Sequence, residues 1–198
     1  MNIGNVANSI NLRDHPNDVF YTPEELAIWL INQVPFDPDN DTISDPFAGK
    51  FVFYDNFPVP AKNKHWCEIN EGEDFWADDT KTDWIITNPP FSQLTEILVE
   101  STNRTKKGFA YLIPSYALSF SRIKKLQDFG FYLHRVCYFE NPKEWQIGFQ
   151  MVFAVWQHFT VTNIDNPHQI SVKYENATHQ AKITQNFFSR SRPGERTI

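Results

Sequence analysis

The sequence DWIITNPPFS, residues 83–92, determines more about the fold of this chain than any other stretch. Its apolar, β-branched half is typical of a buried strand, and the two prolines that follow cannot donate backbone hydrogen bonds to a sheet. Proline also restricts the residue before it to extended conformations, so the strand must end close to Asn88 in a rigid turn. Ligands of open α/β sheets bind at the carboxyl ends of strands, and we therefore expect a binding site at this turn.

The turn is predicted to hold three chemical groups together: the side-chain amide of Asn88, the backbone carbonyl of Pro89 and the ring of Phe91. Two hydrogen-bond acceptors beside an aromatic face suit a planar group that carries an amine, such as a nucleobase. Asn-Pro is also a common turn initiator, and these residues alone fit a polar turn at a strand end equally well. The sequence upstream favours the binding site.

Acidic residues lie at or near the ends of the three segments that precede this turn, at Asp45, Glu68 and Asp74. This order, with NPPF last, resembles the S-adenosylmethionine-dependent amino-methyltransferases. The nearest match is to the DNA N6-adenine methyltransferases in which the cofactor motif precedes the catalytic motif. The resemblance covers roughly residues 15–158, and the combination of motifs is far more specific than any single one.

The resemblance implies a site for S-adenosylmethionine. The turn that ends at Gly49 would contact the methionine part of the cofactor, since glycine lets the backbone come close to a ligand. Glu68 would bind the ribose hydroxyls and Asp74 the adenine amine. For each residue alone, an exposed acid or a helix cap is the commoner explanation. The inference of a cofactor site rests on the order of these residues along the chain. The implied cofactor-binding residues are Tyr21, Thr22, Pro23, Asp45, Phe47, Gly49, Glu68, Asp74 and Phe75.

The implied reaction is methyl transfer from S-adenosylmethionine to the exocyclic N6 amine of adenine in DNA, with Asn88, Pro89, Pro90 and Phe91 as the catalytic residues. Hydrogen bonds from the amine to Asn88 and to the Pro89 carbonyl would draw its nitrogen toward a tetrahedral geometry. Phe91 would stack on the base. An adenine inside a duplex must be flipped out to reach such a site, and Trp145 is a candidate to close over it.

One departure from the family pattern, and the choice of substrate, leave alternatives open. The family has a second glycine two residues after Gly49, and this chain has Phe51 there. A bulky ring could narrow the cofactor pocket, so a catalytically silent binding module with the methyltransferase fold is one alternative. A second is methylation of an RNA base or of a protein glutamine amide, although enzymes of those classes more often carry Tyr at the position of Phe91.

The chain also lacks a recognisable target-recognition domain, since only about 40 residues follow the last predicted sheet strand. Loops of the domain would then read a short sequence, or a specificity subunit or a dimer partner would contribute to recognition. The net charge of −6 argues against a non-specific nucleic-acid coat, but it allows a local basic surface on a nucleic-acid enzyme.

Strands that alternate with helices predict an α/β protein with right-handed crossovers. We expect a Rossmann-like class I methyltransferase fold, with a seven-stranded, mostly parallel sheet and an antiparallel last strand. Residues 1–160 are predicted to form the methyltransferase domain, and residues 161–198 an extension that adds one β pair at 169–174 but no independent domain. The predicted strands end at Asp45, Glu68 and Thr87 or span residues 74–76, 109–113, 131–139 and 149–159.

Four helices are predicted from capping residues and apolar periodicity. The first begins with Thr22 as N-cap and Pro23 as its first residue, which suits the fixed φ of proline. A short crossover helix is expected within residues 50–57, a third helix after Ser92 as its cap, and a fourth over residues 119–129.

Composition adds expectations about location and metal content. No stretch approaches 18 uninterrupted apolar residues and the start has no signal-peptide pattern, so we expect a cytoplasmic protein without a membrane span. Cys67 and Cys137 lie in apolar runs and are expected to be free, buried thiols. Without histidines at the usual ligand spacing, these two cysteines predict no metal site.

Overall fold

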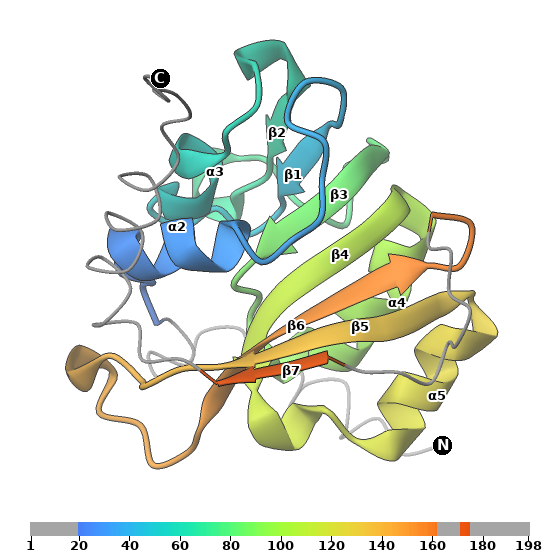
Figure 1. Ribbon diagram of the computed structural model, residues 1–198. Coiled ribbons are helices and arrows are strands. Elements are labelled where there is room, and N and C mark those ends of the chain that lie inside the picture. The colour runs from blue at the N-terminus through green and yellow to red at the C-terminus, as the bar shows by residue number, and fades with distance from the viewer. Residues whose placement is uncertain (1–19, 162–170, 175–198) are drawn as a thin grey trace, which may run out of the picture.

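The computed structural model describes residues 20–161 and 171–174 (Figure 1). Their strands form a seven-stranded sheet in the order β2-β1-β3-β4-β6-β5-β7. Adjacent strands run parallel except at β6, which is antiparallel to both of its neighbours. The strands are β1 (Ile43–Asp45), β2 (Lys64–Trp66), β3 (Thr82–Thr87), β4 (Thr105–Pro114), β5 (Phe131–Tyr138), β6 (Met151–His158) and β7 (Ser171–Tyr174).

Helices cover both faces of the sheet, with α2 and α3 on one face and α4 and α5 on the other (Figure 1). Successive strand residues point to opposite faces, so Ile86 joins the core beneath α2 whereas Ile85 packs against α4. The α-helices are α2 (Glu24–Ile31), α3 (Val52–Asn56), α4 (Leu94–Arg104) and α5 (Phe120–Asp128). Single 3₁₀ turns are η1 (Ala61–Asn63), η2 (Ile69–Glu71), η3 (Phe91–Gln93), η4 (Ser115–Ala117) and η5 (Lys143–Trp145).

The predicted α/β class and mostly parallel sheet are confirmed, but two details of the strand set are wrong. Residues 74–76 form a turn rather than a strand, because the Asp74 side chain and carbonyl accept hydrogen bonds from the backbone of the following residues. The seventh strand is instead β7, which lies within the β segment predicted at 169–174 in the extension and pairs parallel to β5. The rest of that extension and residues 1–19 lie outside the described residues.

The expected antiparallel strand is β6, but it is neither at the edge of the sheet nor last in the chain. It lies between β4 and β5. A connection with no α-helix joins β5 to β6, and such a connection allows neighbouring strands to pair antiparallel.

Two of the four predicted helix starts are wrong. Pro23, in an extended conformation, is the N-cap of α2, and the Thr22 hydroxyl faces Asn88 instead of capping the helix. The single turn η3 precedes α4, which moves the N-cap from Ser92 to Gln93. The crossover helix α3 is confirmed, as is Ser119, whose hydroxyl accepts a hydrogen bond from the Arg122 backbone N–H at the start of α5.

Both cysteines are buried and neither forms a disulfide, as expected. Among the residues that the structure describes, none of the helices has the length and apolar character needed to cross a membrane.

Candidate active site

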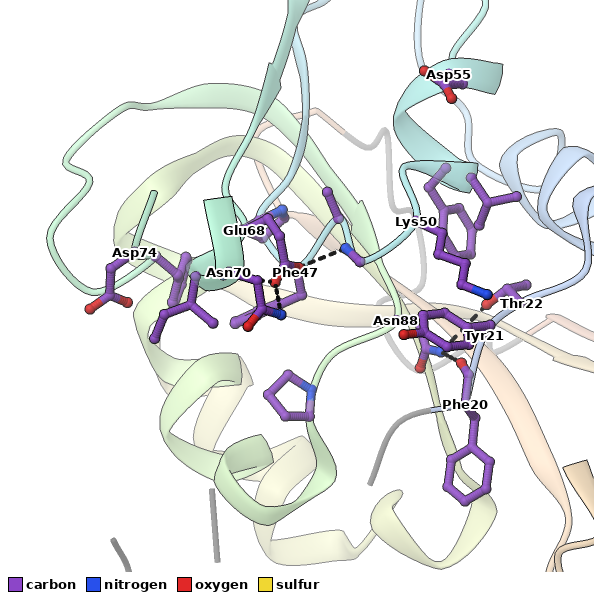
Figure 2. Close-up of a pocket in the computed structure, with 18 of the residues that line it drawn as sticks. Phe20, Tyr21, Thr22, Phe47, Lys50, Asp55, Glu68, Asn70, Asp74 and Asn88 are labelled. Atoms are coloured by element: carbon purple, nitrogen blue, oxygen red, sulfur yellow. Dashed lines mark hydrogen bonds between the residues drawn. The ribbon is translucent and has the colours of Figure 1, made fainter. Parts of the chain in front are cut away.

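A cavity of about 900 Å³ opens at the carboxyl ends of β1, β2 and β3. Figure 2 shows Glu68, Asn70 and Asp74 on one side of it, and Asn88, Thr22 and Tyr21 on the other. Parallel strands bring their carboxyl ends to the same edge, which explains why segments distant in sequence meet here. The predicted site residues that line the cavity are Tyr21, Thr22, Phe47, Gly49, Glu68, Asp74, Phe75, Asn88 and Pro90.

The other four predicted residues lie behind this lining. Pro23 begins α2, Pro89 is buried, and Asp45 is fully buried beneath the turn that follows β1. Phe91 stacks on Phe20, with the ring centroids 6.0 Å apart, and packs against the core beneath α2. In this structure these four residues support the cavity wall and do not line the cavity.

Glu68 ties two strand-end loops together at the cavity wall. One carboxylate oxygen accepts a hydrogen bond from the Gly49 backbone N–H at 2.7 Å. The other accepts from the backbone and side-chain nitrogens of Asn70, at 3.1 and 2.8 Å. Because a carboxylate oxygen has two lone pairs, the oxygen bonded to Gly49 retains acceptor capacity for one hydroxyl group of a ligand.

Asp45 supports the turn after β1 from below. Its carboxylate accepts a 2.7 Å hydrogen bond from the Thr87 hydroxyl, at the end of the neighbouring strand β3. Burial raises the pKa of Asp45 to about 7, because desolvation penalises the charged carboxylate more than this hydrogen bond favours it. The side chain therefore links the two strand ends that carry the cofactor and catalytic motifs.

The Asn88 side chain has a defined orientation. Its amide nitrogen donates to the carbonyl of Phe20 at 2.6 Å and to the Thr22 hydroxyl at 3.4 Å. The side-chain oxygen is thereby turned away from these two acceptors. Residues 20–22, which we call the strap, thus cross the NPPF turn and position its amide, as Figure 2 shows.

Trp145 anchors the strap on its other side. The indole N–H donates to the carbonyl of Tyr21 at 2.9 Å, and the ring packs between Phe20 and Phe139. Only 6% of this residue is exposed. The expectation that Trp145 closes over a flipped base is therefore wrong, because its ring is part of the core.

Phe51 does not narrow the cavity. Its ring lies outside the lining and packs edge-on against Trp66 and Tyr54, with centroids 5.0 and 6.0 Å away. Its backbone has φ 63°, in the left-handed region that favours glycine. A glycine would adopt this conformation without strain, and Phe51 adopts it with its ring held by these aromatic contacts.

This geometry predicts how two substitutions at Phe51 differ. Phe51→Ala loses the ring and keeps a side chain in the left-handed conformation, whereas Phe51→Gly loses the ring and removes that strain. We expect the glycine variant to be more stable than the alanine variant by roughly 1–2 kcal/mol in urea unfolding. Titration with S-adenosylmethionine should give equal affinities for parent and both variants. Tighter binding of S-adenosylmethionine by the glycine variant alone would show instead that the Phe51 side chain narrows the cofactor pocket.

The residues that line the cavity but were missed by the sequence analysis include Phe20, Lys50, Asn70, Trp76 and Gln93. Most of them flank a predicted motif residue, so adjacency was the available signal. Trp76 presents a ring that is 40% exposed, and the Lys50 ammonium lies 3.9 Å from the centroid of the Tyr21 ring.

No family model matches the sequence, and no curated protein matches it. Solved structures do match. A class I S-adenosylmethionine-dependent methyltransferase from Listeria monocytogenes superposes with a TM-score of 0.57 at 12% identity, over 93% of this chain and 75% of that one. The fold is that of a class I methyltransferase. This agrees with the seven-stranded sheet and its single antiparallel strand.

Two further matches come from other branches of this fold. A modification subunit of a type I restriction enzyme from Vibrio vulnificus gives a TM-score of 0.55 at 12% identity, over 96% of this chain. An RNA methyltransferase from Pyrococcus horikoshii gives 0.54 at 17% identity, over 76% of this chain and 95% of that one. The chain spans 57% of the length of the Vibrio subunit.

Proposed function

We propose that this protein is an S-adenosylmethionine-dependent methyltransferase that methylates the N6 amine of adenine in DNA. The observation that carries the proposal is the orientation of Asn88. Its amide nitrogen is held by the strap, on the wall of a cavity that also presents the Glu68 carboxylate. An amide oxygen positioned at the carboxyl end of a strand can accept a hydrogen bond from a planar amine.

The cavity suits the proposed cofactor in size and in the order of its polar groups. Its volume of about 900 Å³ is within the range of small-molecule and cofactor sites. Glu68 offers a carboxylate to a cis-diol, and Asp74 and Trp76 offer an acceptor and an aromatic face to an adenine ring. Gly49, at φ 52°, brings backbone to the cavity between these groups and the strap.

The bound cofactor supplies an electrophilic methyl group on a sulfonium sulfur. In this proposal the Asn88 side-chain oxygen, on the cavity wall, accepts an N–H group of the target amine. This bond draws the nitrogen lone pair out of the aromatic ring and directs it toward the methyl group. It also strengthens as positive charge develops on nitrogen in the transition state. A proton then leaves the product amine to solvent, so no strong base is required.

Features of the same sheet edge support a nucleic-acid substrate. The segment after β4, next to β3 in the sheet, exposes the rings of Tyr116 (67%) and Phe120 (81%). Arg122 and Lys125 lie two and five residues after Phe120, in α5. Exposed aromatic rings beside cations suit bases and phosphates. We propose that a specificity subunit or a second copy completes recognition, since one of the matching structures is a modification subunit of a restriction enzyme.

A methyl-transfer assay tests the proposal. Labelled S-adenosylmethionine is incubated with the protein and with duplex DNA, single-stranded DNA or RNA, and the modified nucleosides are identified by mass spectrometry. We expect N6-methyladenine in DNA. Methylated RNA bases would place the chain closer in function to the Pyrococcus match, and saturable cofactor binding without any product would favour a silent binding module.

A further inference from the structure

A second group of potential ligands, His65, Cys67 and Asp78, lies at the end of β2 and outside the residues that line the cavity. One carboxylate oxygen of Asp78 lies 2.8 Å from His65 Nε2 and 3.3 Å from Cys67 Sγ. The sulfur and the imidazole nitrogen are 3.8 Å apart. Three atoms of different chemistry thus form a compact triangle.

We propose that His65, Cys67 and Asp78 form a binding site for a divalent transition-metal ion, with Zn²⁺ as the best match. Imidazole nitrogen, thiolate sulfur and carboxylate oxygen are the three donor types that zinc takes in proteins. With zinc bond lengths of about 2.0–2.3 Å, ligand atoms of a tetrahedral site lie roughly 3.4–3.6 Å apart. The observed triangle needs only small side-chain movements to reach these separations.

The fold presents the three ligand atoms together. His65 and Cys67 are two residues apart along an extended segment, so their side chains point to the same side. Asp78 comes from the loop before β3, and its other carboxylate oxygen accepts a hydrogen bond from the Thr80 backbone N–H. That bond directs the remaining oxygen at His65 and Cys67, as the hydrogen bonds of outer-shell groups do in known metal sites.

Access and coordination number fit an exchangeable site. The side chains of His65 and Asp78 are 32% and 21% exposed, whereas Cys67 is 1% exposed. Three protein ligands leave a fourth position for water, reached from the open side. Without a metal ion, the buried Cys67 thiol donates a hydrogen bond to Asp78. Binding of the ion displaces this proton to solvent.

Occupancy would constrain one wall of the cavity. The loop that carries Asp78 also carries Asp74, Phe75 and Trp76, and a metal ion would fasten it to the end of β2. Ordering a loop before its ligand arrives lowers the cost of binding. Tighter binding of S-adenosylmethionine by the metal-loaded protein follows only if the proposed function holds, whereas metal binding itself does not depend on it.

The test is a Co²⁺ titration of the untagged, chelator-treated full chain in the absence of any nucleotide or cofactor. Co²⁺ reports a thiolate ligand by a near-ultraviolet charge-transfer band and a tetrahedral site by intense visible bands. We expect both bands to saturate at one equivalent and to vanish when Zn²⁺ is added. Cys67→Ser and His65→Gln should weaken binding by more than about 100-fold, while Cys137→Ser, at the other buried cysteine, leaves it unchanged.

His65→Gln protects the test against misfolding, because this side chain is partly exposed and its loss leaves no large cavity. Circular dichroism and thermal melting of each variant confirm that it is folded. A folded parent that gives no charge-transfer band would overturn the proposal and leave the triangle as a hydrogen-bonded strut. Binding that survives in both ligand variants would overturn it too, since the ion would then be held elsewhere.

Discussion

Asn88→Ala is expected to lower methyl transfer by about 10²–10³-fold, the loss typical of removing one group that stabilises charge in a transition state. The affinity for S-adenosylmethionine should change little, because Asn88 acts on the target amine. Single-turnover methylation of DNA, paired with calorimetric titration of the cofactor, measures the two effects separately. Turnover equal to that of the parent would remove the proposed mechanism.

Asn88 also holds the strap, so a matched variant is needed to separate the two roles. Asn88→Asp keeps an oxygen acceptor for the substrate amine but loses the donor to the Phe20 carbonyl. A variant that recovers part of the activity would assign the main effect to the acceptor. Glu68→Ala provides the opposite contrast: cofactor binding should weaken first, because Glu68 lies on the side of the cavity opposite Asn88.

Asp45→Asn is expected to remove a large pH dependence of stability. The pKa of Asp45 is raised from 3.8 to about 7 in the folded protein, so the native state binds a proton that the unfolded state releases between these values. The stabilising contribution is complete below about pH 4 and is lost as the pH rises through 7. It amounts to something on the order of 4 kcal/mol, from about 1.4 kcal/mol per unit of pKa shift.

Urea unfolding of the parent and of Asp45→Asn between pH 4 and pH 8 checks this expectation. Asparagine keeps an oxygen that accepts the Thr87 hydroxyl hydrogen bond and removes only the titration. Other carboxylates contribute equally to both proteins, so the difference in unfolding free energy isolates Asp45. The unfolding free energy of the parent should fall relative to that of Asp45→Asn as the pH rises. A difference independent of pH would show that the carboxylate is ionised throughout.

Much of the architecture was predictable from local sequence. Apolar runs that end at Asp45 and at Asn88 predicted β1 and β3, and proline at positions 89 and 90 marked a strand end that no sheet context could extend. Serine at position 119 predicted the start of α5. The segment at 74–76 was misassigned because Asp74 can satisfy nearby backbone donors itself, which favours a turn over a sheet edge.

The approximate location of the site was also predictable, because parallel strands bring their carboxyl ends to one edge whatever their side chains. By itself, the sequence determined the α/β class, the ends of β1 and β3 and the cluster of polar residues beside the NPPF turn. It could not determine which of those residues face the cavity. Whether a side chain faces the cavity depends on small rotations at the strand ends. These rotations are set by packing between segments far apart in the chain.

Only the tertiary structure therefore decided the remaining roles. Asp45 lies beneath its turn and Trp145 lies in the core, since burial of each is determined by neighbours from other elements. Phe51 adopts a glycine-like backbone conformation because its ring is held by the rings of Trp66 in β2 and Tyr54 in α3. His65 and Asp78 meet only after a loop of twelve intervening residues closes. Local patterns determine which elements form, whereas contacts between distant segments determine which side chains meet.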